Sequence, residues 1–571
     1  MYTAMALIIV SVILLAIVSL VAASKAARQR ELALLKQKRQ ERLRVEACGE
    51  TVLFFANNLG YIARSVISKD EISQLIDNGI SPEELAITIA KRIEQAEGLI
   101  LGYQVFDHIK FNVKLPLDSR QRHLYIVGKS GSGKTNLMRT MIFQDMLLGN
   151  GLGVIAPEQE MIFEEILPYV PDHRIDDVIL FDPSDPNCPS FNPLHLDEGE
   201  DVDVKVDEVL TIFSRIISSN SGPRMEELLR QALYALIGRP GVTLLDIERL
   251  LDRTDPSFRS YIINSCKDPQ QAHFWQNVYP SFPKDAHLPI TNRLGRFLRP
   301  KVICNILCNP KQSLNFRQVM DEGKILLFNL SDGILGEQNS QLLGQLVVSK
   351  FQLAVMSRAQ MPKESRRQFF LYVDEFQTFT GTAATSYEKI LSRARKYKLG
   401  LILAHQQTGQ IPTQLLKEIL GNVSTSICFL VSREDASKFS KELITTQNGE
   451  IINIPEEEIL RLKVGQCWCK IGQQTFLMHT YLADQHPDHN RVEYIVQKAR
   501  FNYGSSCNLI AVSESELVQG TTYQDKAKKS NTSVKSSKQT LKKSPNKNQT
   551  IASPSKSNDL DDLDPANIFD S

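Results

Sequence analysis

The chain has 571 residues, enough for two to four domains, and its 42% hydrophobic and 23% charged content is typical of a globular protein. The formal net charge of +1 gives no overall indication of a nucleic-acid partner, so the distribution of charge matters more than its sum. Nine cysteines without paired CxxC spacing do not fit a disulfide framework or a zinc site. We interpret them as small buried hydrophobic residues in a reducing compartment.

The N-terminus carries an almost unbroken apolar run from Ala4 to Ala23, about as long as one bilayer crossing requires. Basic residues follow this run from Lys25 onward, whereas residues 1–5 contain no Lys or Arg. Because positive charge favours the cytoplasmic side, we expect a single-pass anchor of the cell membrane over residues 1–24, with the rest of the chain in the cytoplasm. A cleaved signal peptide or a buried core helix is the alternative, but a signal peptide normally has a basic start and a shorter apolar core.

The segment 25–119 is expected to be a cytoplasmic helical stalk followed by an N-terminal helical region. Residues 24–45 are rich in good helix formers, and residues 50–105 also have a helical character. The tetrapeptide Ser81-Pro82-Glu83-Glu84 is typical of a capped helix start with proline in the first turn.

From residue 120 onward, short apolar runs alternate with helical stretches, which predicts a parallel β-sheet covered by helices on both faces. The expected strands are His123–Val127, Leu152–Ala156, Val178–Phe181, Ile325–Leu330, Phe369–Val373, Leu399–Ala404 and Ser426–Val431. The interval between the third and fourth strands shows helical periodicity and is too long for a loop. We therefore predict an α/β domain over 120–200 and 311–504, interrupted by an inserted all-α domain over 201–310.

The remaining segment, 505–571, is expected to be a disordered tail. Residues 521–558 contain nine lysines and hardly any large apolar side chain, so burial cannot offset the entropy of ordering. The last segment, 559–571, sets four large apolar residues among five aspartates and is typical of a short docking peptide.

The strongest motif is GKSGSGKT over residues 128–135, which matches the phosphate-binding pattern GxxxxGK[ST] between an expected strand and an expected helix. Glycines allow successive backbone N–H groups to point at phosphate oxygens, and the helix N-terminus adds its dipole. Lys134 is predicted to reach the β- and γ-phosphates of ATP, and the Thr135 hydroxyl to ligate Mg²⁺. The predicted nucleotide-binding residues are Gly128, Lys129, Ser130, Gly131, Ser132, Gly133, Lys134 and Thr135.

A second motif is the apolar strand 369–373 followed by Asp374 and Glu375. Such a strand delivers both carboxylates to the sheet edge that carries the phosphate-binding loop. We expect Asp374 to hold Mg²⁺ through water and Glu375 to polarise the attacking water. Strand-to-turn junctions also produce this pattern by chance. The motif therefore indicates a nucleotide site only in combination with the phosphate-binding pattern at 128–135.

A third stretch, 390–407, places Arg393 and Arg395 on a helix and Gln406 at the tip of the next strand. Gln406 is positioned to sense the γ-phosphate, and an arginine on the helix can reach the nucleotide of a neighbouring subunit. The residues alone equally allow surface arginines and a strand-end His-Gln pair that is hydrogen-bonded locally. We interpret His405 as a packing or hydrogen-bonded residue rather than a catalytic one.

With these motifs the chain resembles the HerA–FtsK superfamily of ring-shaped P-loop motors, and within it the coupling proteins of type IV secretion and conjugation systems. The resemblance covers about residues 120–480 and includes Phe-Asp-Pro-Ser at 181–184, Phe-Asn-Pro-Leu at 191–194 and Arg395-Lys-Tyr. It implies a RecA-like fold, with Arg395 as a trans-acting finger and Gln406 as a sensor. It departs from the family pattern in showing one membrane helix where two are common, and in having His405 where the family usually has Thr.

The resemblance implies a homo-hexamer that uses ATP and Mg²⁺ to move DNA, expected to be single-stranded and bound without sequence preference, toward a secretion channel. Partners would then include secretion-channel and relaxosome proteins, contacted through the acidic peptide 559–571. A secretion- or pilus-type ATPase that energises protein traffic without pumping DNA is the main alternative. A membrane-bound scaffold with an inactive site and a soluble repair helicase are two weaker ones.

Overall fold

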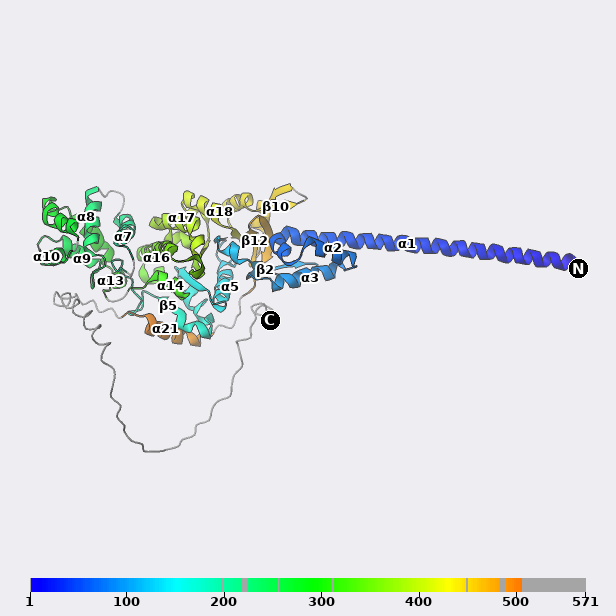
Figure 1. Ribbon diagram of the computed structural model, residues 1–571, viewed down its shortest axis with the longest axis horizontal. Coiled ribbons are helices and arrows are strands. Elements are labelled where there is room, and N and C mark those ends of the chain that lie inside the picture. Colours follow the sequence, from blue (N-terminus) through cyan, green and yellow to red (C-terminus); the bar gives the residue numbers. More distant parts are fainter. Residues whose placement is uncertain are drawn as a thin grey trace, which may run out of the picture.

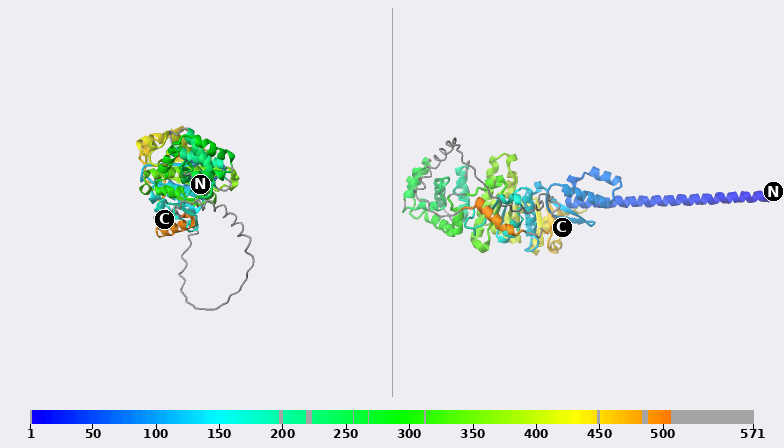
Figure 2. Two further views of the ribbon diagram at one scale, coloured as in Figure 1. Left: turned by 90° about the vertical axis from the view of Figure 1, so that its left-hand side faces the viewer. Right: turned by 90° about the horizontal axis from the view of Figure 1, so that it is seen from below.

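The computed structural model describes residues 2–196, 200–217, 223–254, 256–266, 268–310, 313–447, 450–482 and 488–505. The molecule is elongated, and its parts follow one another along the long axis (Figures 1 and 2). The N-terminal helix α1 extends from one end, the β-sheet occupies the middle, and a group of helices forms the opposite end. The predicted disordered tail and its acidic peptide lie outside the described residues, apart from Ser505.

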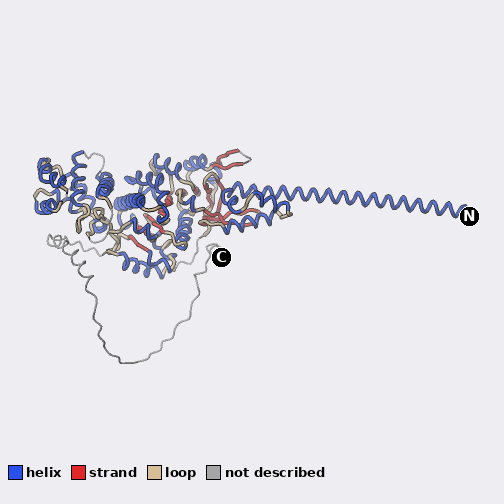
Figure 3. The backbone as a smooth tube through the Cα atoms, in the orientation of Figure 1, coloured by secondary structure: helices blue, strands red, loops and turns tan. Residues whose placement is uncertain are grey.

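The central feature is an 11-stranded sheet with the order β2-β1-β13-β12-β9-β3-β8-β7-β4-β6-β5. All the predicted strands are present and run parallel to one another: β3 (Leu124–Val127), β4 (Gly151–Ala156), β5 (Val178–Phe181), β6 (Ile325–Asn329), β7 (Phe369–Val373), β8 (Leu399–His405) and β9 (Thr425–Cys428). Four antiparallel strands extend the sheet beyond β9: β12 (Gln466–Ile471), β13 (Gln474–His479), β1 (Leu99–Phe106) and β2 (Ile109–Leu115). The strands lie between α1 and the terminal group of helices (Figure 3).

Alternate residues of the parallel strands face two separate apolar cores, as a sheet covered on both faces requires. On β7, Leu371 packs into one core and Tyr372 into the other. The second core also receives α5 (Lys134–Leu147), the helix that follows the phosphate-binding loop. The first core receives α16 (Glu337–Ser357) and α17 (Ala384–Arg393). The remaining helices of the α/β domain are α4 (Leu117–Arg120), α6 (Gln159–Phe163), α14 (Phe316–Glu322), α15 (Asp332–Leu335), α18 (Thr413–Asn422), α19 (Arg433–Glu442), α20 (Glu456–Leu460) and α21 (Asn490–Tyr503).

The N-terminal helix α1 (Tyr2–Val66) is one continuous element of 65 residues. Its first part is exposed and is long and apolar enough to cross a membrane. Its last part buries the side chains of Cys48, Phe55 and Ile62, which pack into the second core together with α3 (Pro82–Gln95). The same helix therefore carries the apolar segment and packs against the α/β domain.

The expected helical character of residues 50–105 is wrong from Leu99 onward, because β1 and β2 form a hairpin there and join the motor sheet. The sequence does carry a strand signal: Lys110 to Leu115 alternates polar and apolar residues. The turn between the strands uses Asp107 and His108, both at positive φ, instead of the glycine that usually marks a tight hairpin. The helices α2 (Lys69–Asp77) and α3 are as expected, and α3 begins with a complete capping box at Ser81 and Glu84.

The interval predicted as an inserted all-α domain contains only helices among its described residues. They are α7 (Val202–Ile217), α8 (Pro223–Leu236), α9 (Leu245–Leu251), α10 (Pro256–Asn264), α11 (Pro269–His273), α12 (Leu288–Leu298) and α13 (Lys301–Leu307). They form the end of the molecule opposite to α1 (Figure 1). The described cysteines are free thiols and are mostly buried, which agrees with their interpretation as core residues.

Candidate active site

The phosphate-binding loop connects β3 to α5 at the carboxyl edge of the sheet. Gly131 and Gly133 have φ values of 72° and 115°, in a region that L side chains rarely adopt. A Cβ on Gly128 would lie 2.6 Å from the Cβ of Phe429, so a larger residue does not fit there either. The loop thus has the conformation in which backbone N–H groups surround a phosphate at a helix N-terminus.

Lys134 is 5% exposed, and its ammonium donates hydrogen bonds to the carbonyl oxygens of Gly128 (2.7 Å) and Lys129 (3.3 Å). Burial lowers the pKa of Lys134, while the nearby carboxylates of Glu375 and Asp374 oppose that shift. The side chain is held inside the loop by weak carbonyl acceptors, which a phosphate group can replace with a stronger, charged acceptor.

The two carboxylates of the second motif stand at the end of β7, two strands from β3 in the same sheet. Asp374 is 7% exposed, and its N–H donates to Ile155 O (3.0 Å) on β4. Burial, reinforced by the charge of Glu375, raises the pKa of Asp374 to about 7. A second cation beside Lys134 would relieve this unfavourable burial of negative charge, as Mg²⁺ does at such sites.

Glu375 is oriented by two glutamines. Gln406 Nε2 donates to Glu375 Oε1 (2.8 Å), and Gln377 Nε2 donates to Glu375 Oε2 (2.8 Å). Glu375 itself has φ of 40°, a left-handed conformation unusual for this residue type. Since each carboxylate oxygen has an amide donor, the carboxyl group has a fixed orientation, and the predicted sensor Gln406 is in direct contact with the predicted base.

His405 is fully buried beside this pair. Its Nε2 shares a hydrogen bond with the Tyr125 hydroxyl, and its Nδ1 lies 3.1 Å from Gln407 O. Burial lowers the pKa of His405 to about 3, so the ring is neutral at physiological pH. Its packing between strands agrees with the interpretation of His405 as a hydrogen-bonded core residue.

Arg395 lies far from the other predicted site residues of its own chain. It belongs to the short 3₁₀ segment Ala394–Tyr397, which precedes β8 at the amino edge of the sheet. Its guanidinium pairs with Asp118 (2.8 Å), which precedes β3 on that same edge. Because the phosphate-binding loop follows β3 at the opposite edge, Arg395 cannot reach the loop within one chain.

Sequence reasoning missed two contributors to the site. Glu158, which follows β4, is close enough to influence electrostatically both Asp374 and Lys134. Gln377 is the second amide that holds Glu375. Position alone could have indicated Glu158, since it follows the strand next to β7, but Gln377 is brought back to Glu375 only by the 3₁₀ turn Phe376–Phe379.

The residues present fit a magnesium nucleotide. Thr135 is exposed at the first turn of α5, and Asp374 ends β7 in the same site, so a hydroxyl and a carboxylate are available to a hard cation. Within the described ranges no cluster of three or more His, Cys, Asp or Glu residues is arranged to hold a metal by itself.

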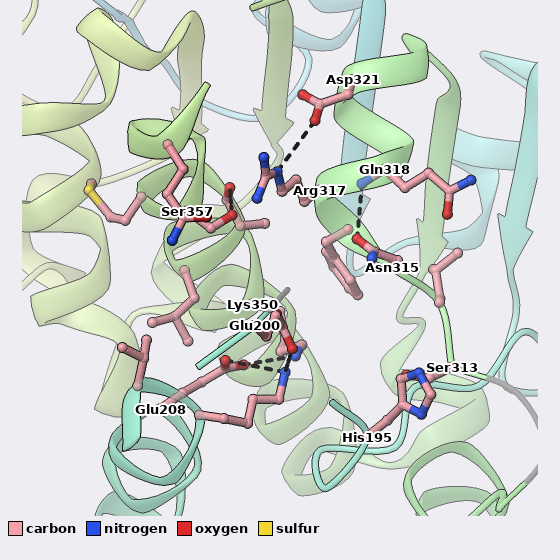
Figure 4. A pocket seen from close by; sticks show the side chains of 18 of the residues that line it. His195, Glu200, Glu208, Ser313, Asn315, Arg317, Gln318, Asp321, Lys350 and Ser357 are labelled. Atoms are coloured by element: carbon pink, nitrogen blue, oxygen red, sulfur yellow. Dashed lines mark hydrogen bonds and ion pairs between the residues drawn. The ribbon is translucent and has the colours of Figure 1, made fainter. Parts of the chain in front are cut away.

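A large cavity, of about 680 Å³, lies elsewhere, between α7 of the helical insertion and α14 and α16 of the motor. Figure 4 shows the charged side chains that line it, including Glu208, whose carboxylate pairs with Lys350 (2.8 Å). These groups connect the two parts of the molecule, and the phosphate-binding loop does not contribute to this cavity.

Comparison with solved structures identifies the same fold in the plasmid coupling protein TrwB. Its complex with the ATP analogue ADPNP superposes with a TM-score of 0.51 at 15% identity, covering 70% of this chain and 94% of that chain. Its complex with ADP and Mg²⁺ gives a TM-score of 0.50 at 15% identity over the same shares. VirB4 of Thermoanaerobacter pseudethanolicus gives 0.48 at 15% identity, covering 68% of this chain and 97% of that one.

No protein-family model matches the sequence, and no curated protein matches it either. The structural comparisons confirm the fold that the sequence resemblance implied: a P-loop α/β sheet with helices, in the arrangement of TrwB.

Proposed function

We propose that this protein is a membrane-anchored ATPase that translocates DNA as a coupling protein of a type IV secretion system. The observation that carries the proposal is the contact of Gln406 with Glu375 in the same site as the phosphate-binding Lys134. The fold shared with TrwB, described as a plasmid coupling protein, supports it.

In this proposal the chain's own residues divide the work of hydrolysis. Lys134 exchanges its carbonyl partners for the β- and γ-phosphates of ATP, and the N–H groups of residues 128–135 surround them. Glu375, oriented by Gln406 and Gln377, accepts the proton of the attacking water. Thr135 and Asp374 would hold Mg²⁺, which would neutralise charge on the phosphates when bound.

Arg395 has a role only between subunits. Its place at the edge opposite to the phosphate-binding loop suits a side chain that completes the site of a neighbouring copy, and a ring offers such a contact at every boundary. We therefore propose a homo-hexamer with nucleotide at each subunit boundary, in which Arg395 offsets transition-state charge in trans.

The anchor and the helical insertion are at opposite ends of the molecule (Figure 2). If the apolar part of α1 spans the cell membrane, the insertion is the part farthest from the bilayer and the first to meet cytoplasmic partners. DNA, bound without sequence preference and expected to be single-stranded, would then be drawn through the ring toward the membrane. The acidic peptide 559–571 is proposed as a contact for secretion-channel or relaxosome proteins.

The test is ATP hydrolysis by the full chain in detergent, measured with and without single-stranded DNA, beside the Lys134→Ala variant. We expect Mg²⁺-dependent hydrolysis that DNA stimulates and that Lys134→Ala abolishes. Hydrolysis that no DNA stimulates would refute DNA translocation and favour an ATPase that energises protein traffic. No hydrolysis under any condition would refute the enzymatic assignment as a whole.

A further inference from the structure

Two exposed apolar side chains lie beside the phosphate-binding loop and have no place in the mechanism above. Val464 is 79% exposed and Leu482 is 80% exposed. Both belong to segments whose backbone is bonded to the loop or to α5. Neither side chain packs into the core of its own chain, so both are available to a ligand at this site.

Val464 stands at the tip of a tight turn, Lys463–Gln466, closed by a hydrogen bond from Gln466 N to Lys463 O (3.0 Å). The next residue, Gly465, has φ of 78° and donates its N–H to Ser132 O in the phosphate-binding loop (3.0 Å). The Gly465 carbonyl in turn accepts from Thr480 N (2.8 Å). Val464 is therefore held in a fixed position directly beside the loop.

Leu482 is held from the other side of the same region. The side-chain amide of Asn136, in the first turn of α5, donates to the carbonyl oxygen of Tyr481 (2.5 Å). Asn136 follows Thr135 and so lies where the loop ends and the helix begins. The backbone that carries Leu482 thus passes next to the start of α5, as Gly465 passes next to Gly133.

The strand order shows which part of a nucleotide would meet these residues. Glu375 is at the end of β7, which lies on one side of β3, whereas Val464 and Leu482 flank β12 and β13 on the other side. Hydrolysis requires the γ-phosphate to lie toward Glu375. The remainder of the nucleotide then extends from the loop toward the side of Val464 and Leu482.

We infer that Val464 and Leu482 form the contact surface for the base of the bound nucleotide. The inference rests on the proposed function, since it assumes ATP in the loop. The two side chains offer apolar area against the flat faces of a purine, which is the usual way in which small-molecule sites bind aromatic groups. Their exposure places that surface at the open side of the site, where the base can enter.

The test separates contacts with the base from contacts with the phosphates. Isothermal titration calorimetry of the full chain in detergent with Mg²⁺ compares ADPNP with inorganic triphosphate, which has no base. We expect Val464→Asp and Leu482→Asp each to weaken ADPNP binding about tenfold while leaving triphosphate binding within twofold, because only the contact with the base is lost. Val464→Ile retains the apolar contact and should bind ADPNP as the unmodified chain does.

Val204→Asp is the matched control, since Val204 is 65% exposed on the helical insertion, away from the loop; it should leave both affinities unchanged. Equal weakening of ADPNP and triphosphate would show a distorted loop and would overturn the inference. Unchanged ADPNP binding would also overturn the inference. If the variants leave ADPNP binding unchanged but reduce the size of the assembly, these side chains contact a neighbouring copy of the chain instead of the base. An unmodified chain that binds neither compound would instead refute the proposed function.

Discussion

Replacement of Arg120 tests the account of how the phosphate-binding helix is fixed to the sheet. The Arg120 guanidinium makes a two-pronged contact with Asp145 on α5 (2.8 and 2.6 Å), and the two side chains are 4% and 0% exposed. The Tyr372 hydroxyl on β7 donates to the same carboxylate (2.6 Å), and Asn150 donates to it as well (2.9 Å). One buried carboxylate thus links α5 to β7 and to α4, the short helix that precedes β3.

Arg120→Met removes the cation but leaves the Asp145 carboxylate buried. Breaking a buried pair from one side costs about 3–5 kcal/mol, and the two remaining donors place the expected cost at the lower end, about 3 kcal/mol. For an α/β domain as large as this one, that corresponds to a fall in melting temperature of roughly 3–6 °C. Thermal unfolding of the full chain in detergent, followed by circular dichroism, measures the change.

Two further variants make this prediction specific. Arg122→Met removes an arginine two residues away that pairs with Asp118 at the surface, with side-chain exposures of 49% and 57%, and should cost less than about 1 kcal/mol. The double variant Arg120→Met with Asp145→Leu removes both charges and should recover most of the lost stability. Equal effects of Arg120→Met and Arg122→Met, or a double variant less stable than Arg120→Met, would refute the reasoning.

Three other predictions follow from named contacts. Glu375→Gln should lower the rate of ATP hydrolysis at least about 100-fold while ATP affinity stays within about threefold, as measured by turnover and calorimetry; equal losses in both would show a binding role instead. Burial lowers the pKa of His123 to about 4, so this histidine is neutral when folded and takes up a proton on unfolding between that value and its ordinary pKa. His123 should therefore contribute a loss of about 2 kcal/mol of stability from pH 7 to pH 5, and His123→Asn should remove that contribution from the pH dependence; an unchanged slope in His123→Asn would contradict this. Lys350→Met should cost about 2 kcal/mol, less than the roughly 3–5 kcal/mol of a fully broken buried pair, because Lys205 remains 3.4 Å from Glu208. It should also speed proteolysis of the helical insertion, because the Lys350–Glu208 pair joins α16 to α7; an unchanged cleavage pattern would show that this pair does not hold the two parts together.

The sequence by itself determined the parallel part of the sheet and the centre of the site. Continuous apolar runs separated by helices predict a sheet that is buried on both faces. The pattern of residues 128–135 is specific because glycine adopts the φ angles of Gly131 and Gly133 far more readily than other residues do. Asp374 and Glu375 followed from the same logic, since parallel strands bring their carboxyl ends to one edge. Helical periodicity likewise predicted the all-α insertion.

Tertiary structure decided what depends on contacts between distant segments. The antiparallel strands β1 and β2 escaped detection because a short hairpin is stabilised mainly by the sheet that it joins, here through β13. The amides that orient Glu375, the distance of Arg395 from its own loop, and the turn that holds Val464 against Ser132 all arise from chain segments far apart in sequence. Local patterns do not contain such pairings, because they exist only once the strand order is fixed.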